Sequence, residues 1–223
     1  LRSRDPMSAP TDRWPYIGSV TPAVLVPVKD FTAAKQRLAP ALSPDERIEL
    51  ARWMAGRVLS AVAELAVFVA CDHPDVCTWA EERGATVAWG PRLGLNGAVD
   101  DGVARIAAAG FDHVIVTHAD LPFPEHLPAV AREGVTTLVP DRRLDGTNVM
   151  SFPTAHPLGA DYGAGSFRRH LRAAQATGQP VEVRFDARLS LDVDTPDDLT
   201  HPMTTEALPA WLPTIPANPF IHG

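Results

Sequence analysis

The chain is poor in cysteine, because Cys71 and Cys77 are the only two among its 223 residues. Two cysteines cannot form a disulfide framework or a cysteine metal cluster, and their scarcity fits the reducing cytosol. No run of about 18 apolar residues is present, so no membrane span is expected. The net charge of -7 argues against bulk binding of nucleic acid. A basic pocket for a nucleotide remains compatible with an acidic protein. We therefore expect a cytoplasmic protein without a membrane or nucleic-acid partner.

The length suits one α/β domain or two small ones, and the hydrophobic content of 45% is ordinary for a globular protein. We expect a main domain over residues 21–200, preceded by an extension over residues 1–20 and followed by a tail over residues 201–223. The extension lacks the apolar core of a signal peptide. Met7 is a candidate native start, with the residues before it left from an expression tag. The proline-rich tail is expected to be an ordered or partly ordered extension, not a second domain.

Strand and helix patterns alternate along the first half of the domain. Apolar runs at 23–28, 66–70 and 85–89 read as buried strands, and the segments 43–65 and 72–84 between them read as helices. This order predicts a mostly parallel sheet that is covered on both faces. Further along, the pattern predicts a strand at 114–117, a strand, turn and strand at 136–152, a helix within 160–178 and a strand at 180–186.

Three cations follow the first predicted strand within a short distance: Lys29, Lys35 and Arg37. The carboxyl end of a first strand in an α/β sheet is a usual place for phosphate to bind. The segment is therefore a candidate anion-binding loop. The alternative is an ordinary solvated loop between a strand and a helix.

Two glycines, Gly94 and Gly97, bracket Leu95 and Asn96 ahead of a helix that we expect to start near Ala98. Small residues at this point let a planar ligand approach the backbone. Asn96 can either cap the helix or hydrogen-bond the edge of a base. The alternative for the whole segment is a cap and a turn without a ligand.

Three aspartates are candidates for a metal site. Asp120 follows the strand at 114–117, at the sheet edge where ligands bind in open α/β folds, although it can also cap a following helix. Asp192 and Asp194 flank one residue of an extended segment, so both carboxylates point the same way and repel unless a cation lies between them. Hard oxygen ligands favour Mg²⁺. The alternatives are a solvated acidic turn and, for nearby His118, a packed residue.

A second candidate anion site lies in the last third of the domain. Thr147 follows the predicted Asp145-Gly146 turn and can offer its hydroxyl to a ligand. Gly163 belongs to a glycine loop, and Ser166 stands where a helix cap is expected, so the helix start can bind phosphate or carboxylate. This loop is not a GxGxxG motif after a strand and gives no support to a dinucleotide-binding fold.

A cationic loop, a glycine-bracketed pocket, three acids and a second anion loop together suit transfer of a nucleotidyl group. In such reactions a metal bridges phosphate oxygens and cations neutralise the developing charge. An attacking phosphate is mostly ionised near neutral pH, since its second pKa is about 6, and needs no general base. The lack of a convincing Ser-His-Asp or Cys-His set agrees with this.

Six segments in order resemble the 2-phospholactate/phosphoenolpyruvate guanylyltransferases of coenzyme F420 biosynthesis: VPVKDFTAAKQRLAPALSPDER, GLNGAVDDG, ADLP, DGTN, YGAGSFRRH and LDVDTPDDL. The resemblance covers residues 24–199. It implies a single Rossmann-like α/β domain of the glycosyltransferase-A-like nucleotidyltransferase type. It also implies transfer of GMP from GTP to a phosphorylated three-carbon acid, with release of pyrophosphate. The content of Ala, Arg and Pro resembles actinobacterial members and favours phosphoenolpyruvate over 2-phospho-L-lactate.

The resemblance also implies roles for the candidate residues, of which Lys29 and the three aspartates would be catalytic. By this likeness Mg²⁺ is held by Asp120, Asp192 and Asp194, and the acid substrate is held by Thr147, Gly163 and Ser166. The triphosphate is contacted by Lys29, Lys35 and Arg37, and the base is contacted by Asn96 and Gly97.

One departure concerns the opening loop, which is VPVKDF here, whereas the wider superfamily often has a glycine-rich loop. Three alternatives stay open. The first is another nucleotidyltransferase, of molybdopterin or sugar-phosphate type. The second is a glycosyltransferase that uses Asp192-Val193-Asp194 as a DxD motif, which the position of this pair near the chain end disfavours. The third is a non-catalytic nucleotide-binding module. The oligomeric state is open, a homodimer included.

Overall fold

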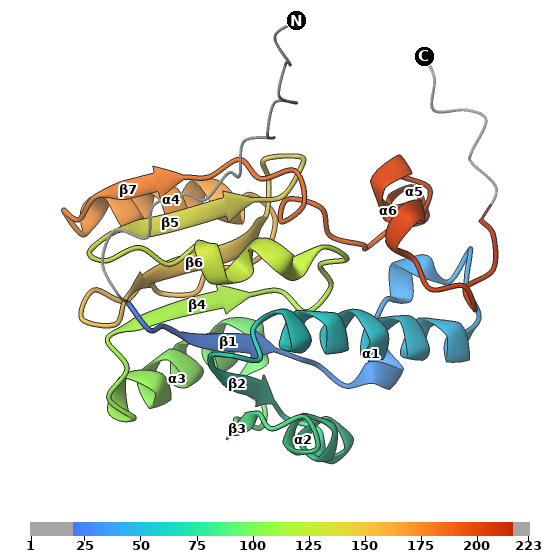
Figure 1. Ribbon diagram of the computed structural model, residues 1–223, viewed down its shortest axis with the longest axis horizontal. Coiled ribbons are helices and arrows are strands. Elements are labelled where there is room, and N and C mark those ends of the chain that lie inside the picture. The colour runs from blue at the N-terminus through green and yellow to red at the C-terminus, as the bar shows by residue number, and fades with distance from the viewer. Residues whose placement is uncertain (1–19, 216–223) are drawn as a thin grey trace, which may run out of the picture.

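A computed structural model of the chain describes residues 20–215 (Figure 1). The predicted extension, apart from its last residue, and residues 216–223 of the predicted tail lie outside the described residues, as does Met7. No helix in the described part of the chain is both long and apolar enough to cross a membrane.

One seven-stranded sheet runs through the described part of the chain, in the order β3-β2-β1-β4-β6-β5-β7. Only β6 runs antiparallel to its neighbours β4 and β5, and the other pairs are parallel. This confirms the predicted mostly parallel α/β sheet. The strands are β1 (Ala23–Pro27), β2 (Ala66–Cys71), β3 (Thr86–Trp89), β4 (His113–Thr117), β5 (Thr136–Pro140), β6 (Thr147–Pro153) and β7 (Val181–Val183).

Helices cover both faces of the sheet, as the alternating pattern predicts. Val24 and Val26 of β1 pack with the apolar sides of α1 and α2, whereas Leu25 packs on the opposite face with α3 and α4. Figure 1 shows α1 in front of the strands and α4 behind them. The helices are α1 (Pro44–Ala61), α2 (Pro74–Glu81), α3 (Gly94–Ala108), α4 (Ser166–Ala176), α5 (Pro196–Leu199) and α6 (Pro202–Ala207), with short 3-10 turns η1 (Phe31–Ala33), η2 (Gln36–Leu38) and η3 (Pro124–Ala129).

Two helix starts differ from the prediction. Helix α3 begins at Gly94 and not near Ala98, so Asn96 and Gly97 lie in its first turn. A Cβ on Gly97 would lie 3.1 Å from Cβ of Leu93, so the glycine lets the chain pack back on itself there. Helix α4 begins at Ser166 and is capped by Gly165, which has a φ of +73° that suits glycine. Ser166 is therefore the first residue of the helix and not its cap.

Several other bounds also shift. Helix α1 starts at the capping box that Ser43 and Glu46 form but ends at Ala61. Strand β7 is shorter than its predicted range of 180–186, and residues 187–190 form a turn. The acids at 192 and 194 follow that turn in a segment outside the sheet.

The segment after α5 packs on the main domain. Leu208, Leu212 and Ile215 form an apolar cluster with Leu50 and Met54 of α1. Figure 1 shows α5 and α6 beside the start of α1. The cluster also includes Val193, so this segment supports the loop that carries Asp192 and Asp194.

Candidate active site

The three predicted metal ligands meet at the carboxyl end of β4. Asp120 follows this strand, and its backbone carbonyl accepts a hydrogen bond of 3.3 Å from the N–H of Val193. Val193 is fully buried, and both of its acidic neighbours lie close to Asp120: Lys35 contacts Asp120 and Asp194 together, and the charge of Asp120 acts on Asp192. Segments far apart in the sequence thus contribute to one acidic cluster at the sheet edge where α/β folds bind ligands.

Lys35 lies between two of these acids. Its Nζ is 2.6 Å from Oδ2 of Asp120 and 2.8 Å from Oδ1 of Asp194, and its side chain is only 9% exposed. Burial alone would lower the pKa of Lys35, but the two carboxylates raise it above its ordinary value. Burial likewise acts to raise the pKa of Asp120, which the adjacent Lys35 ammonium lowers. The cation that was expected to face a triphosphate is thus ion-paired with the acids.

Asp192 is the least compensated of the three carboxylates. Burial, followed by the charges of Asp120 and Asp194, raises its pKa to about 6. Nδ2 of Asn148 donates to the carbonyl of Leu189 at 3.0 Å and lies 3.5 Å from Oδ1 of Asp192. Asn148 therefore holds the turn before Asp192, but it supplies little charge compensation. An added cation would relieve the repulsion at this carboxylate.

The chemistry of the cluster fits a hard divalent cation. Oδ1 of Asp120 is buried and has no hydrogen-bond partner within residues 20–215. Over the same range, no three His, Cys, Asp or Glu side chains group closely enough to hold a metal alone. Mg²⁺ is commonly held by one or two carboxylates, with water and substrate phosphates completing the shell. The free oxygen of Asp120 and the repelled Asp192 suit such a partial protein site.

A hollow of about 300 Å³ adjoins the acids, and part of the loop that follows β1 lines it. Its lining includes Lys29, Lys35, Asp120, Asp194 and His118. The structure therefore brings both predicted lysines to the acids, with Lys29 the more exposed of the two.

Arg37 stays at the outside of this group. Its side chain is 78% exposed, and its Nη1 is 3.9 Å from Oδ2 of Asp194. It can reach a ligand that extends out of the hollow.

The predicted base-side residues are partly engaged by the protein itself. Oδ1 of Asn96 accepts a hydrogen bond of 2.9 Å from the N–H of Tyr162. Asn96 therefore neither caps α3 nor has its amide oxygen free. Gly97 follows it, and Leu95 lines the hollow beside the acids. The first turn of α3 thus borders the hollow.

The predicted acid-substrate residues form a second cluster at the start of α4. Gly163 precedes the helix, and Ser166 is fully buried in its first turn. The carboxylate of Asp145 accepts a hydrogen bond of 3.0 Å from the N–H of Gly165, so a protein carboxylate already contacts this helix start. Thr147 begins β6, and its hydroxyl lies 3.0 Å from Nδ1 of His170. Thr147, Gly163 and Ser166 thus share one region around the starts of β6 and α4.

Tyr162 connects the two clusters. Its ring packs edge-on against His118 at 5.1 Å, and His118 lines the hollow beside the acids. The same ring packs against His170 at 5.0 Å. The acid cluster and the α4 cluster are therefore adjacent parts of one site.

Comparison with known proteins identifies the family to which the chain belongs. The model of the family described as "Guanylyl transferase CofC like" matches residues 22–205. The chain belongs to this family. This confirms the predicted resemblance and the prediction of a guanylyltransferase enzyme.

Named relatives cover most of the chain. The phosphoenolpyruvate guanylyltransferase of Sphaerobacter thermophilus is 34% identical over 189 residues, which are 81% of this chain and 91% of the relative. The 2-phospho-L-lactate guanylyltransferase of Methanothermobacter thermautotrophicus is 34% identical over 190 residues, 78% of this chain and 81% of the relative.

Solved structures agree on the fold. A nucleotide-diphospho-sugar transferase structure from Desulfovibrio desulfuricans superposes with a TM-score of 0.66 at 18% identity, covering 81% of this chain and 85% of that chain. A nucleotidyl transferase from Methanothermobacter thermautotrophicus gives a TM-score of 0.54 at 13% identity, covering 82% of this chain and 95% of that chain. The predicted nucleotidyltransferase-type fold is thereby confirmed.

Two supporting residues of this guanylyltransferase family member escaped the sequence reasoning. His170 is fully buried and contacts both Thr147 and the loop before α4. Its position inside the quoted YGAGSFRRH segment was the only signal available.

Asp198 is the second supporting residue that the sequence did not reveal. It is fully buried, and its Oδ2 accepts hydrogen bonds from the N–H groups of Asp194 at 3.1 Å and Thr195 at 2.8 Å. Its Oδ1 pairs with Arg142 and Arg143. Burial acts to raise the pKa of Asp198, but these hydrogen bonds lower it to about 2. The Thr195-Pro196-Asp197-Asp198 pattern indicated the capping box but not the arginine partners.

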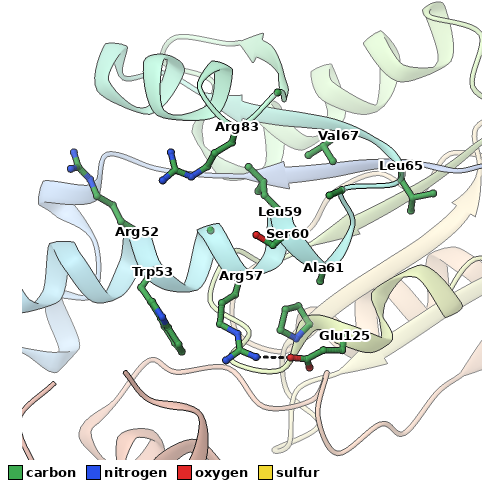
Figure 2. Close-up of a pocket in the computed structure, with 14 residues that line it drawn as sticks. Arg52, Trp53, Arg57, Leu59, Ser60, Ala61, Leu65, Val67, Arg83 and Glu125 are labelled. Atoms are coloured by element: carbon green, nitrogen blue, oxygen red, sulfur yellow. Dashed lines mark hydrogen bonds and ion pairs between the residues drawn. The ribbon is translucent and has the colours of Figure 1, made fainter. Parts of the chain in front are cut away.

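A larger hollow of about 850 Å³ lies away from the acids, between α1, the end of α2 and η3. Figure 2 shows Arg52, Arg57 and Arg83 around it, with Arg57 paired to Glu125 at 2.5 Å. None of the predicted site residues lines it. Its size therefore does not make it the candidate active site.

Proposed function

We propose that the protein transfers GMP from GTP to a phosphorylated three-carbon acid and releases pyrophosphate, as a step of coenzyme F420 biosynthesis. The observation that carries this proposal is the convergence of Asp120, Asp192 and Asp194 with Lys35, in a cluster of which all members except Asp192 line one hollow. An acidic cluster with an adjacent cation is the arrangement that binding of a metal and a triphosphate requires.

The acids would hold Mg²⁺ through the free oxygen of Asp120 and the repelled carboxylate of Asp192. When bound there, Mg²⁺ would neutralise phosphate charge and hold the phosphate oxygens in place for displacement. The protein's own contribution is positioning: Val193 is anchored to Asp120, and Asn148 holds the turn before Asp192.

Lys29, Lys35 and Arg37 would share the charge of the triphosphate. Lys29 and Lys35 line the hollow, and exposed Arg37 stands at its outer side. Positive charge placed before the reaction stabilises the transition state without reorganisation of the solvent. In the proposed state the ammonium of Lys35 would move from Asp120 and Asp194 towards the phosphates.

The acceptor acid would lie at the start of α4, held by Thr147, Gly163 and Ser166. A threonine hydroxyl is a suitable donor for a phosphate or a carboxylate, and the N–H of Gly165 would become a second donor when the substrate displaces the carboxylate of Asp145. The attacking phosphate is already ionised, so the site requires no general base. The guanine would lie along the first turn of α3, near Asn96 and Gly97.

Phosphoenolpyruvate is the favoured acceptor, and 2-phospho-L-lactate is the second candidate. The relatives from Sphaerobacter thermophilus, Rubrobacter xylanophilus and Conexibacter woesei are named phosphoenolpyruvate guanylyltransferases. Relatives at a similar identity are named 2-phospho-L-lactate guanylyltransferases. The two acids differ at the carbon that bears the phosphate, which is planar in one and tetrahedral in the other.

The deciding experiment measures pyrophosphate release with GTP and Mg²⁺ and one acceptor at a time. The acceptors are phosphoenolpyruvate, 2-phospho-L-lactate, 3-phosphoglycerate and mannose 1-phosphate, and ATP, CTP and UTP replace GTP in parallel. We expect release with GTP and phosphoenolpyruvate, and a guanylylated product of matching mass. Release with mannose 1-phosphate alone would replace the proposal by a sugar-phosphate enzyme. GTP binding without release for any acceptor would indicate a nucleotide-binding module.

A further inference from the structure

His170 of α4 is a fully buried histidine that belongs to neither the acid cluster nor the predicted substrate residues. It lies between the start of β6 and the loop that precedes its own helix. Both of its ring nitrogens have protein partners: the N–H of Asp161 and the hydroxyl of Thr147, each at 3.0 Å.

These partners determine which nitrogen carries the proton. The backbone N–H of Asp161 can only donate, so Nε2 of His170 must accept. In a neutral imidazole the other nitrogen, Nδ1, then carries the hydrogen and donates it to Oγ1 of Thr147. Burial lowers the pKa of His170 to about 4; the charge of Asp161 acts to raise it, and Arg169 and His118 act to lower it further, so the ring is neutral at physiological pH.

The tautomer sets the role of the Thr147 hydroxyl. A hydroxyl has one hydrogen to donate and two lone pairs. One lone pair of Thr147 is taken by His170, and its own hydrogen has no other protein partner within residues 20–215. A threonine held in this way presents a donor, which matches an anionic oxygen and not a cation.

The second contact of His170 acts on the loop that carries Gly163. Its Nε2 holds the N–H of Asp161, and its ring packs against Tyr162 at 5.0 Å. Tyr162 is in turn tied to Asn96 through its backbone N–H. One buried ring therefore fixes both sides of the proposed acceptor site, Thr147 on β6 and the loop before α4.

We infer that His170 is a positioning residue for the acceptor acid: it orients the Thr147 hydroxyl as a donor to the anion and holds the Gly163 loop opposite to it. This inference rests on the proposed function of the site. It does not require His170 to touch the substrate or to exchange a proton.

The test separates the two hydrogen bonds by conservative substitution. In His170→Asn the amide nitrogen can replace Nδ1 and keep the bond to Thr147, and in His170→Gln the amide oxygen can replace Nε2 and keep the bond to Asp161. His170→Phe removes both bonds, and Thr147→Val removes the hydroxyl. Steady-state KM values are measured separately for phosphoenolpyruvate and GTP, with thermal unfolding of each variant.

We expect His170→Phe and Thr147→Val each to raise KM for phosphoenolpyruvate at least tenfold and to leave KM for GTP within twofold. For His170→Asn, which keeps the bond to Thr147, KM for phosphoenolpyruvate should lie much closer to the wild-type value than that of His170→Phe. In the double variant His170→Phe/Thr147→Val, KM for phosphoenolpyruvate should exceed that of Thr147→Val by no more than about threefold, because both changes remove the same shared interaction.

The matched control is His113→Phe. His113 is also a buried histidine, with 2% exposure and one hydrogen bond of 2.8 Å to Ser151. It begins β4 and so lies at the end of this strand that is away from Asp120. This variant should lose stability while KM for phosphoenolpyruvate stays within twofold. If both phenylalanine variants raise the two KM values equally, or if His170→Phe changes neither, the inference is wrong.

Failure of the proposed function is distinguishable from failure of this inference. If wild-type protein releases no pyrophosphate, direct binding of phosphoenolpyruvate is measured by calorimetry. Weaker binding by His170→Phe than by wild type would still support the positioning role, and absence of binding to wild type would overturn it.

Discussion

Lys35 shows how one residue can serve as the internal cation of an acidic site. Its backbone lies in the left-handed region, with φ of 53°, and its ammonium bridges Asp120 and Asp194. A non-glycine residue in this conformation is held there by its surroundings. The ion pairs give a physical reason, because in this conformation one ammonium contacts the carboxylates of both Asp120 and Asp194.

Replacement of Lys35 by Met should therefore expose the repulsion among the acids. We expect Lys35→Met to lower the unfolding temperature in the absence of divalent ions and to reduce turnover at least a hundredfold. Mg²⁺ alone, without GTP, should raise the unfolding temperature of the variant more than that of wild type. Thermal unfolding with and without Mg²⁺ measures this. Lys29→Met, which removes an exposed lysine of the same hollow, is the control, and an equal response of both variants to Mg²⁺ would contradict the prediction.

Asp192→Asn should separate activity from stability at a single residue. The substitution keeps the size of the side chain and removes a charge that burial, Asp120 and Asp194 all disfavour. We expect turnover to fall by at least a hundredfold, while the unfolding temperature at neutral pH stays the same or rises. Pyrophosphate release and thermal unfolding are the two measurements. Activity close to that of wild type would rule out Asp192 as a metal ligand.

At the scale of elements, Asp198 joins two segments that bear different parts of the site. Its two carboxylate oxygens divide their hydrogen bonds between the start of α5, beside Asp194, and the hairpin that connects β5 to β6. The same hairpin contacts the start of α4 through Asp145. Asp198 thus connects the acid loop to the proposed acceptor side.

Asp198→Ala should loosen this connection. The change leaves backbone N–H groups of Asp194 and Thr195 without their acceptor and two arginines without their buried partner. We expect a loss of about 2 to 3 kcal/mol in the free energy of unfolding, below the full value for a buried pair because the arginines are partly exposed. Urea unfolding measures it, and kcat should fall at least tenfold as Asp194 shifts. Asp197→Ala, at the exposed neighbouring position, should change neither, and a similar effect of both variants would contradict this role.

The elements also show where local sequence patterns are sufficient. Ser43, Pro44 and Glu46 form the predicted capping box because a capping box needs only residues three apart. The start of α3 was misplaced because Gly94 and Gly97 are typical of a loop, whereas the close approach of Leu93 leaves room only for a glycine at position 97 inside the helix. Ser166 looked like a cap for the same reason, since nothing local shows that Gly165 takes the left-handed conformation.

At the scale of the whole molecule, two buried histidines couple stability to pH. Burial lowers the pKa of His113 and of His170 to about 4. The charges near them are Asp112 for His113, and Asp161, Arg169 and His118 for His170. Because an unfolded histidine titrates near about 6.5, the unfolded chain binds more protons between these values. Stability is therefore full above about pH 6.5 and decreases as pH falls towards about 4.

We expect each ring to account for a loss of about 1 to 2 kcal/mol in the free energy of unfolding between pH 7 and pH 5. Urea unfolding at both pH values measures the total. The His113→Phe and His170→Phe variants should each lose part of this pH dependence, even though both are less stable at pH 7. A His113→Phe or His170→Phe variant that keeps the full pH dependence of the wild type would show that the replaced histidine is not neutral in the folded state.

The sequence by itself determined the alternation of strands and helices, the parallel part of the sheet and the placement of Asp120 at its carboxyl edge. These features follow from apolar periodicity and from the rule that the carboxyl ends of parallel strands lie at the same edge of a sheet. Both can be recognised from short segments of the sequence. The quoted segments likewise sufficed for the family.

Only the tertiary structure decided which groups touch. Lys35 pairs with acids 85 and 159 positions away, His170 joins β6 to the loop before α4, and Asp198 reaches arginines 55 and 56 positions away. Such contacts depend on the register of distant strands and on which charge is buried beside which. A local pattern carries no information on either, because the same residues in another register would face other partners.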